Sequence, residues 1–106
     1  SNSQYRSIID VVDDNGQAID ISNTDSLVYE ITDRRGGEET LFSITDDEFN
    51  FQIEDNGDSN VANIFIEAEE ITWSDVVWEE LRVNFTPTER TVVLQRPVAF
   101  YETSTL

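Results

Sequence analysis

Apolar and polar residues alternate near the end of the chain, which is the pattern of a β-strand with one buried face. Between residues 77 and 85 the apolar side chains fall at every second or fourth position, with charged or amide side chains between them. Pro87 follows this run, and its fixed φ favours a chain reversal. The pattern predicts that residues 76–100 form a two-stranded antiparallel ribbon, which needs a second apolar layer for stability.

The same alternation recurs in shorter segments along the rest of the chain, separated by turn residues. These segments cover residues 5–12, 27–32, 41–44, 49–54 and 62–67. Asn15-Gly16 and Asn56-Gly57 supply tight turns, because Asn and Gly tolerate a positive φ, and residues 69–74 can close one helical turn. Seven or eight short strands without a sustained helical period predict an all-β sandwich of two antiparallel sheets.

A chain of 106 residues is expected to form one domain with a single core. We expect residues 1–4 to be a flexible N-terminus, residues 5–102 the sandwich and residues 103–106 a C-terminal tail. Pro97 lies inside the last predicted strand, which indicates an edge position or a bulge there. The predicted core consists of apolar residues on the inward parity of the strands, namely Ile9, Val11, Leu27, Tyr29, Ile31, Phe51, Ile53, Ile64, Ile66, Leu81, Val83, Leu94, Val98 and Phe100.

The chain carries 23 acidic residues and 6 basic ones, all arginine, for a formal net charge of -17. Molar salt screens such self-repulsion, because the Debye length falls to about 3 Å at 1 M. The composition resembles that of proteins from salt-loving archaea and their viruses, although an ordinary acidic, highly soluble protein also fits it. The charge argues against direct binding to nucleic acid or to an anionic membrane, since phosphate contacts need clustered Lys and Arg.

Catalytic chemistry is not expected from these residues. The chain has no His and no Cys, so no Ser/His or Cys/His nucleophile pair can be built. No apolar run approaches the roughly 18 residues of a membrane span. Acidic neighbours such as Glu79 and Glu80 are not expected to act as a glycosidase pair, because neighbours on a strand point to opposite faces. We therefore expect a protein that is not an enzyme.

Acidic residues gather at three turns, and carboxylates are ligands that Ca²⁺ prefers. The weak metal candidates are Asp13, Asp14 and Asp20 at one turn and Asp55 and Asp58 at another, with a further cluster at Asp46, Asp47 and Glu48. The first two turns do not match the spacing of an EF-hand. The acidic turns either hold loosely bound Mg²⁺, Na⁺ or Ca²⁺ or are solvated, and no dedicated cofactor is expected.

Several aromatic, apolar and basic residues are candidates for contact with a partner protein. They are Trp78, Phe65, Val93, Trp73, Arg34 and Arg35. Trp78 falls on the strand face opposite the predicted core, where a large aromatic side chain often anchors an interface. Trp73 lies in the irregular segment, where it either contacts a partner or covers the end of the sandwich. The adjacent Arg34 and Arg35 either pair with carboxylates of a neighbouring copy or are solvated.

The order of strands and turns resembles a known group of viral proteins. The segments that carry the resemblance are residues 13–21, Tyr29 with Asp33, and residues 53–57, 66–72, 78–83, 92–94 and 98–100. They are similar to the small immunoglobulin-like β-sandwich modules of tailed viruses of bacteria and archaea, of which the N-terminal domain of upper baseplate proteins is one example. Arg96-Pro97 stands where that family usually has glycine, and Val77-Trp78 stands where it has a tyrosine-rich stretch.

The resemblance implies an antiparallel, two-sheet immunoglobulin-like β-sandwich of seven or eight strands. It also implies a non-enzymatic structural component of a virus particle, in the tail, the baseplate or the head-to-tail region, which docks on other virion proteins and on copies of itself. Together with the acidic composition it implies a virus of a salt-loving archaeon. The alternative hypothesis is a glycan- or Ca²⁺-binding β-sandwich module at a cell surface, with Trp73 or Trp78 in an open cleft.

Overall fold

The computed structural model describes residues 4–22, 24–34, 37, 39–55, 57–85 and 90–100, without the side chains of Arg90 and Val92. Residues 1–3 of the expected flexible N-terminus, the expected tail at residues 103–106 and the turn at residues 86–89 lie outside this part of the chain. The described residues form one short 3₁₀ helix, Ala68–Glu70, and seven strands. The strands are β1 (Tyr5–Asp10), β2 (Ser26–Thr32), β3 (Thr40–Thr45), β4 (Phe51–Glu54), β5 (Val61–Ile66), β6 (Asp75–Phe85) and β7 (Arg90–Phe100).

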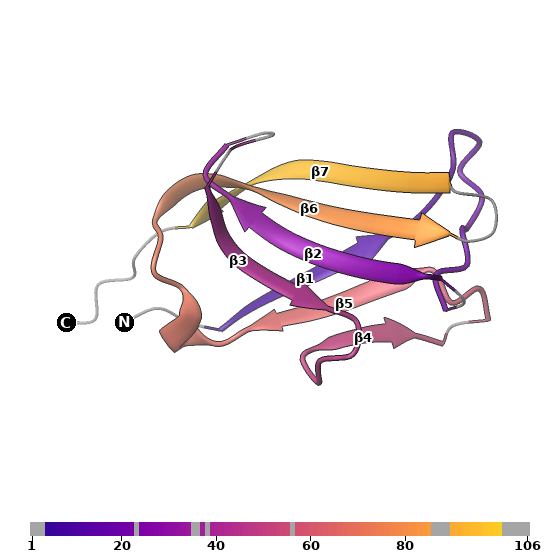
Figure 1. Ribbon diagram of the computed structural model, residues 1–106, viewed down its shortest axis with the longest axis horizontal. Coiled ribbons are helices and arrows are strands. Elements are labelled where there is room, and N and C mark those ends of the chain that lie inside the picture. The colour runs from indigo at the N-terminus through magenta and orange to yellow at the C-terminus, as the bar shows by residue number, and fades with distance from the viewer. Residues whose placement is uncertain are drawn as a thin grey trace.

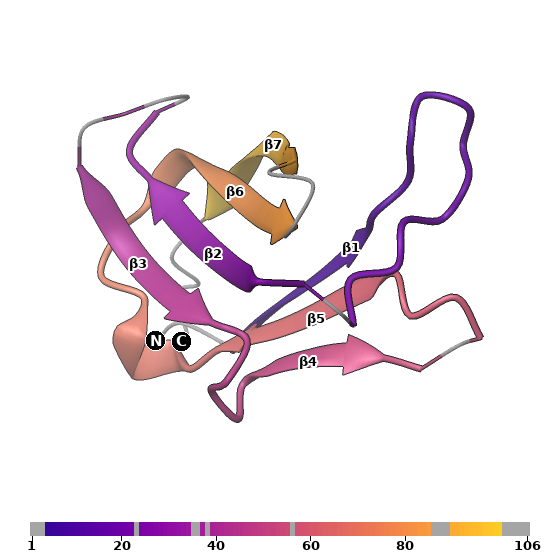
Figure 2. The ribbon, with the colours of Figure 1, turned by 45° about the vertical axis from the view of Figure 1, so that its right-hand side comes forward.

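Two antiparallel sheets make up the fold, which confirms the predicted all-β, two-sheet architecture. The smaller sheet has the strand order β1-β5-β4 and the larger sheet has the order β3-β2-β6-β7. Figures 1 and 2 show the sheets as two layers. The edge strands β3 and β4 follow one another along one side of the sandwich, and the edge strands β1 and β7 lie along the other.

The β4–β5 hairpin and the β6–β7 ribbon form where the alternation predicts them. In the hairpin Phe51 pairs with Ile64, whereas Phe49, which the alternation includes in the same strand, precedes it in a turn and is 83% exposed. The ribbon keeps one continuous register along both strands. Pro97 lies in β7 at the edge of the larger sheet, which confirms the predicted edge position.

Two of the irregular segments follow the turn chemistry in the sequence. β1 ends before Val12, which instead pairs with Ala18 in an isolated bridge across a turn. Gly16 in this turn has a φ of 78°, a conformation that costs a residue without a Cβ little. The helical turn expected at residues 69–74 forms one residue earlier, as the 3₁₀ helix Ala68–Glu70, and residues 71–74 are irregular. No helix among the described residues is long and apolar enough to cross a membrane.

The core lies between the two sheets and contains most of the predicted residues. Ile53, Leu94, Val98 and Phe100 are only half-buried, and all four lie on the edge strands β4 and β7, which have a neighbour on one side alone. The core also contains residues that we did not predict there, namely Ile21, Ile44, Val61, Ala62, Ile71, Trp73 and Val77.

Candidate functional site

A glutamate side chain lies inside the sandwich. Glu79 is on β6 between Val77 and Leu81, and it shares their inward-facing parity. Only 1% of its surface is exposed. A buried carboxylate costs several kcal/mol in lost hydration unless it is paired and hydrogen-bonded. The groups around Glu79 must therefore compensate for that loss.

Four side chains donate hydrogen bonds to the Glu79 carboxylate. Ser7 Oγ lies 2.8 Å from Oε1 and 3.0 Å from Oε2. The hydroxyl groups of Tyr5 and Tyr29 each lie 3.2 Å from Oε2. Arg96 Nε lies 2.7 Å from Oε1, so this contact is also an ion pair. The network joins β1 of the smaller sheet to β2, β6 and β7 of the larger sheet.

The Arg96 side chain bridges the gap between the two sheets. It starts on β7 and is half-exposed, with 51% of the side-chain surface open to solvent. Its Nη2 donates to Ser7 Oγ at 3.3 Å and to the main-chain carbonyl of Ile8 at 3.4 Å. The planar guanidinium group can make several directed hydrogen bonds at once, which suits this position. Arg96 thus connects two edge strands that share no backbone ladder.

A chain of aromatic rings surrounds the same network. The ring centroids of Tyr29 and Phe42 are 6.4 Å apart, and those of Phe42 and Trp73 are also 6.4 Å apart. Trp73 meets Phe100 at 5.5 Å, and Phe100 meets Tyr5 at 4.8 Å. The rings at the two ends of this aromatic series belong to Tyr29 and Tyr5, and their hydroxyl groups donate hydrogen bonds to Glu79. The aromatic chain thus closes one end of the sandwich around the carboxylate and lowers its access to water.

The surroundings shift the pKa values of three donors to Glu79. Burial raises the pKa of the Tyr29 and Tyr5 hydroxyls, and the negative charge of Glu79 raises it further. For Arg96 burial alone lowers the pKa, but the hydrogen bond and the charge of Glu79 outweigh this effect, so the pKa is raised. All three side chains keep their protons at neutral pH and remain hydrogen-bond donors.

Alkaline pH is expected to destabilise the fold through Tyr29. Its pKa is raised in the folded state, so above about pH 10 the unfolded chain loses a proton that the folded chain retains, and the free energy of unfolding falls as the pH rises further. Tyrosinate absorbance and circular dichroism, followed together from about pH 8 to about pH 12, test this loss of stability, because tyrosine titrates in this range. We expect part of the tyrosine signal to appear only as the sheet unfolds. Titration of all 3 tyrosines near pH 10 in a folded protein would contradict the assignment.

A hollow of about 260 Å³ lies beside the network, between the edge strands β1 and β7. It is lined by Ile8, Ile9, Asp10, Glu79, Leu94, Gln95 and Arg96. Sites for small molecules usually have volumes of about 300–1,000 Å³. The hollow is smaller than that, and its size suits a single side chain of a partner better than a cofactor.

The arrangement around Glu79 favours a structural role for this side chain. A general base needs a carboxylate oxygen that is free to accept a proton from a bound substrate. Both oxygens of Glu79 instead accept hydrogen bonds from the protein's own side chains, including Ser7 and Arg96. The network links β1 of the smaller sheet to β6 and β7 of the larger sheet, with which β1 shares no backbone ladder.

A second feature is the patch that we call the outer apolar face, formed by Val76, Trp78, Pro97 and Ala99. Trp78 pairs with Pro97, and Val76 pairs with Ala99, so the four side chains lie together on the solvent side of β6 and β7. Val76 is 53% exposed, whereas Trp78 is half-buried. Val93, 45% exposed, lies farther along the same side of β7. Trp78 and Val93 therefore face outward, as their parity in the sequence predicts.

The other predicted interface residues lie apart from this face. Phe65 is half-buried on the outside of the smaller sheet, with the Arg6 guanidinium 4.4 Å from its ring centroid. Trp73 is 9% exposed, so it packs in the sandwich and covers its end. Arg34 is exposed between β2 and β3, and Arg35 lies outside the described residues.

The acidic candidates for metal binding are engaged in their own turns or exposed. Asp13 Oδ1 accepts from the main-chain nitrogens of Asn15 and Gln17, each at 2.9 Å. Asp20 Oδ1 accepts from the Ser22 hydroxyl at 2.6 Å and from the Ser22 nitrogen at 2.8 Å, and these bonds lower the pKa of Asp20. The exposed acidic candidates are Asp14, Asp46, Asp47, Glu48, Asp55 and Asp58. Within the described residues no group of three or more acidic side chains is placed to hold a metal ion.

The buried ion pair between Glu79 and Arg96 was not predicted from the sequence. The signal is present, because Glu79 is in phase with the inward-facing Val77 and Leu81, and Arg96 is in phase with Leu94. An acid and a base at inward positions of paired strands indicate a buried ion pair.

Comparison of this chain with protein-family models, curated proteins and solved structures finds no significant match.

Proposed function

We propose that this chain is a non-enzymatic structural module of a tailed virus particle, which acts by docking on neighbouring subunits in a multi-copy assembly. The tail, the baseplate and the head-to-tail region are the parts of the particle where such a module fits. The resemblance in the strand and turn segments supports this assignment. The net charge of -17 supports a virus of a salt-loving host, because assembly of such acidic copies requires strong screening.

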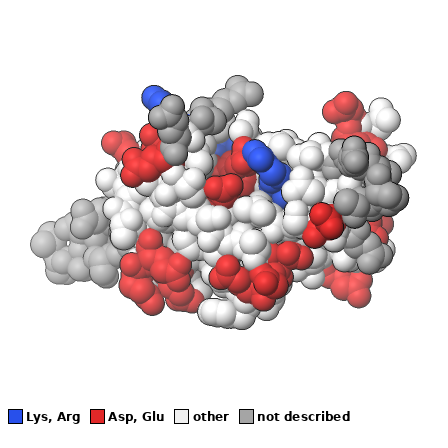
Figure 3. Space-filling model, in the orientation of Figure 1, with Lys and Arg blue, Asp and Glu red and all other residues white. Residues whose placement is uncertain are grey.

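The observation that carries the docking function is the outer apolar face. A Trp and a Pro lie side by side on a sheet face that the described residues leave partly exposed, with the aliphatic pair Val76 and Ala99 next to them. Contiguous exposed apolar area of this kind is typical of protein interfaces, in which Trp is the most favoured anchor. Acidic side chains are spread over much of the molecular surface seen in Figure 3. An apolar face is therefore a distinct surface through which highly charged copies can associate.

The strand order supports an immunoglobulin-like version of the sandwich. In immunoglobulin domains strands B, E and D of one sheet face strands C, F and G of the other, and a C′ strand can extend the second sheet. The order β1-β5-β4 corresponds to B-E-D, and the order β3-β2-β6-β7 corresponds to C′-C-F-G. The sequence order of the seven strands fits this correspondence throughout.

The alternative, a glycan- or Ca²⁺-binding module, has less support. It requires Trp73 or Trp78 in an open cleft with polar groups converging on one point. Trp73 is packed between Phe42 and Phe100, and Trp78 lies on a sheet face beside Pro97. The hollow between β1 and β7 is lined by neither tryptophan.

Mass spectrometry of purified virus particles tests the proposed function. We expect tryptic and acid-protease peptides of this chain in the particle, in several copies and at a constant ratio to the major structural protein across preparations. A matched sample of infected-cell lysate gives the unassembled level. If the chain is abundant in the lysate but absent from particles purified in molar salt, the proposed function is wrong.

A further inference from the structure

Among the described residues, no strand pairs with the outer edge of β1. The main-chain nitrogen of Val11 donates to the Asn60 carbonyl at 2.9 Å, so the odd-numbered residues of this segment direct their backbone groups toward β5. In an antiparallel pair the residues between them direct their N–H and C=O groups away from the partner strand. Arg6, Ile8 and Asp10 therefore present these groups along the free edge. The contact from Arg96 to the Ile8 carbonyl, at 3.4 Å, is consistent with this direction.

The two free edges on this side of the sandwich differ in how they are protected. β7 contains Pro97, whose ring replaces an N–H and blocks continuous pairing with an added strand. β1 contains no proline, and the side chain that reaches its free edge is the half-exposed Arg96. The 3.4 Å contact to the Ile8 carbonyl can break while Arg96 Nε keeps its 2.7 Å ion pair with Glu79. The free edge of β1 is thus available to an extended segment.

The hollow beside β1 gives such a segment a place for a side chain. Its apolar walls include Ile9 and Leu94, and it lies between the two layers, directly next to the free edge. Side chains of an added strand alternate between the two faces of the sheet, so every second one would point toward this hollow. If β1 corresponds to strand B, as proposed above, this is the edge that pairs with strand A in immunoglobulin domains.

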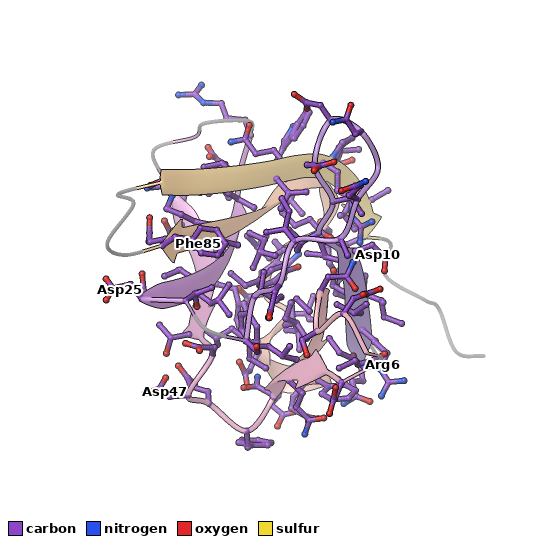
Figure 4. The ribbon with its side chains drawn as sticks, turned by 90° about the vertical axis from the view of Figure 1, so that its right-hand side faces the viewer. Arg6, Asp10, Asp25, Asp47 and Phe85 are labelled. Carbon is purple, nitrogen blue, oxygen red and sulfur yellow. The ribbon has the colours of Figure 1, made fainter. Side chains whose placement is uncertain are left out.

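Charge selects the kind of segment that fits. The lining of the hollow includes Asp10, whose exposed side chain forms no ion pair or hydrogen bond among the described residues. Figure 4 shows Asp10 and Arg6 on the same side of the molecule, away from Asp25 and Asp47. Arg96 adds no net attraction for anions, since it is paired with Glu79. At roughly 0.15 M salt, where screening is weak, the net charge of -17 favours a basic segment over a second copy of this chain at this edge.

We propose that the free edge of β1 binds an extended segment of a partner protein in which apolar and basic residues alternate. The segment adds a strand to the smaller sheet through the backbone of Arg6, Ile8 and Asp10. One apolar side chain fills the hollow against Ile9 and Leu94, and a basic side chain on the outward face lies beside Asp10. The site uses the edge of β1 and the hollow, whereas the outer apolar face lies on the solvent side of β6 and β7, so a peptide can bind here whether or not the proposed docking function holds.

A peptide titration tests this site. The probe is a fluorescein-labelled nonapeptide of alternating valine and arginine, and the comparison peptide alternates valine and glutamate. At roughly 0.15 M salt we expect the arginine peptide to bind with a dissociation constant below about 100 µM and the glutamate peptide to bind at least about tenfold more weakly. Amide hydrogen exchange should slow at Arg6, Ile8 and Asp10 on addition of the arginine peptide, whereas the neighbouring Ser7 and Ile9 amides should change little.

Two controls separate strand addition from non-specific attraction to an acidic protein. Ile8→Pro removes an N–H that faces the free edge, and we expect it to weaken binding at least about tenfold, while Ile8→Thr keeps the N–H and should bind within about twofold of the natural chain. If Ile8→Pro does not fold, an arginine peptide with N-methyl groups on alternate amides replaces it and should lose binding to the same extent. Equal binding of the N-methylated peptide, of the glutamate peptide or of Ile8→Pro would overturn the proposal, as would absence of binding at about 1 mM peptide.

Discussion

Replacing Glu79 by alanine is expected to lower the free energy of unfolding by about 3–5 kcal/mol. The substitution leaves the buried Ser7 and Tyr29 hydroxyls without their acceptor and leaves the Arg96 guanidinium without its charge partner. Removing one member of a buried pair costs more than the pair contributes, because the remaining groups are desolvated and unpaired. Urea unfolding followed by circular dichroism measures the change.

Glu80→Ala is the matched control for this substitution. Glu80 is the next residue on β6, but it faces outward, where it contacts Arg82 and Gln95. An ion pair at the surface contributes about 1 kcal/mol or less, so the control should unfold close to the natural chain. If Glu79→Ala is no more destabilising than Glu80→Ala, the network does not hold the two sheets together.

Replacing Trp73 by alanine is expected to cost about 3–5 kcal/mol, whereas Trp78→Ala should cost less than about 2 kcal/mol. Trp73 is 9% exposed and packs against Phe42 and Phe100, so its removal leaves a cavity in the aromatic chain. Trp78 is half-buried on the outer apolar face, where solvent can fill the vacated space.

The two tryptophan variants control for one another, because the same side chain is removed from the inside and from the outside of the sandwich. Thermal and urea unfolding of both proteins give the comparison. Equal destabilisation, or a larger effect for Trp78, would show that the division between the core and the outer apolar face is drawn incorrectly.

The period-two alternation was sufficient to predict the two-sheet architecture. It placed Tyr29, Ile64 and Leu81 in the core, because each lies in a strand with neighbours on both sides, and burial then follows from parity. The same rule overstated the burial of Leu94 and Phe100, since sequence parity does not reveal which strand is at the edge of a sheet. Pro97 was the local signal for that edge.

The buried network was harder to predict because its members come from four strands. Glu79 and Arg96 are adjacent only through the register of β6 and β7, while Tyr5, Ser7 and Tyr29 reach the carboxylate from β1 and β2. The alternation could not predict whether Trp73 faces inward, because Trp73 lies outside the strands, between the 3₁₀ helix and β6. Its burial depends on Phe42 and Phe100, which are distant in the sequence.

Hydroxyl-radical footprinting of the chain, free and inside purified virus particles, tests the central claim most directly. In the free chain we expect oxidation at Trp78 and Val93, which face outward, and at Phe49, which is 83% exposed and distant from the outer apolar face. In the particle Trp78 should be protected by the neighbouring subunit, and the protection should be lost when the particle is dissociated. Equal oxidation of Trp78 in the free chain and in the intact particle would contradict docking through this face.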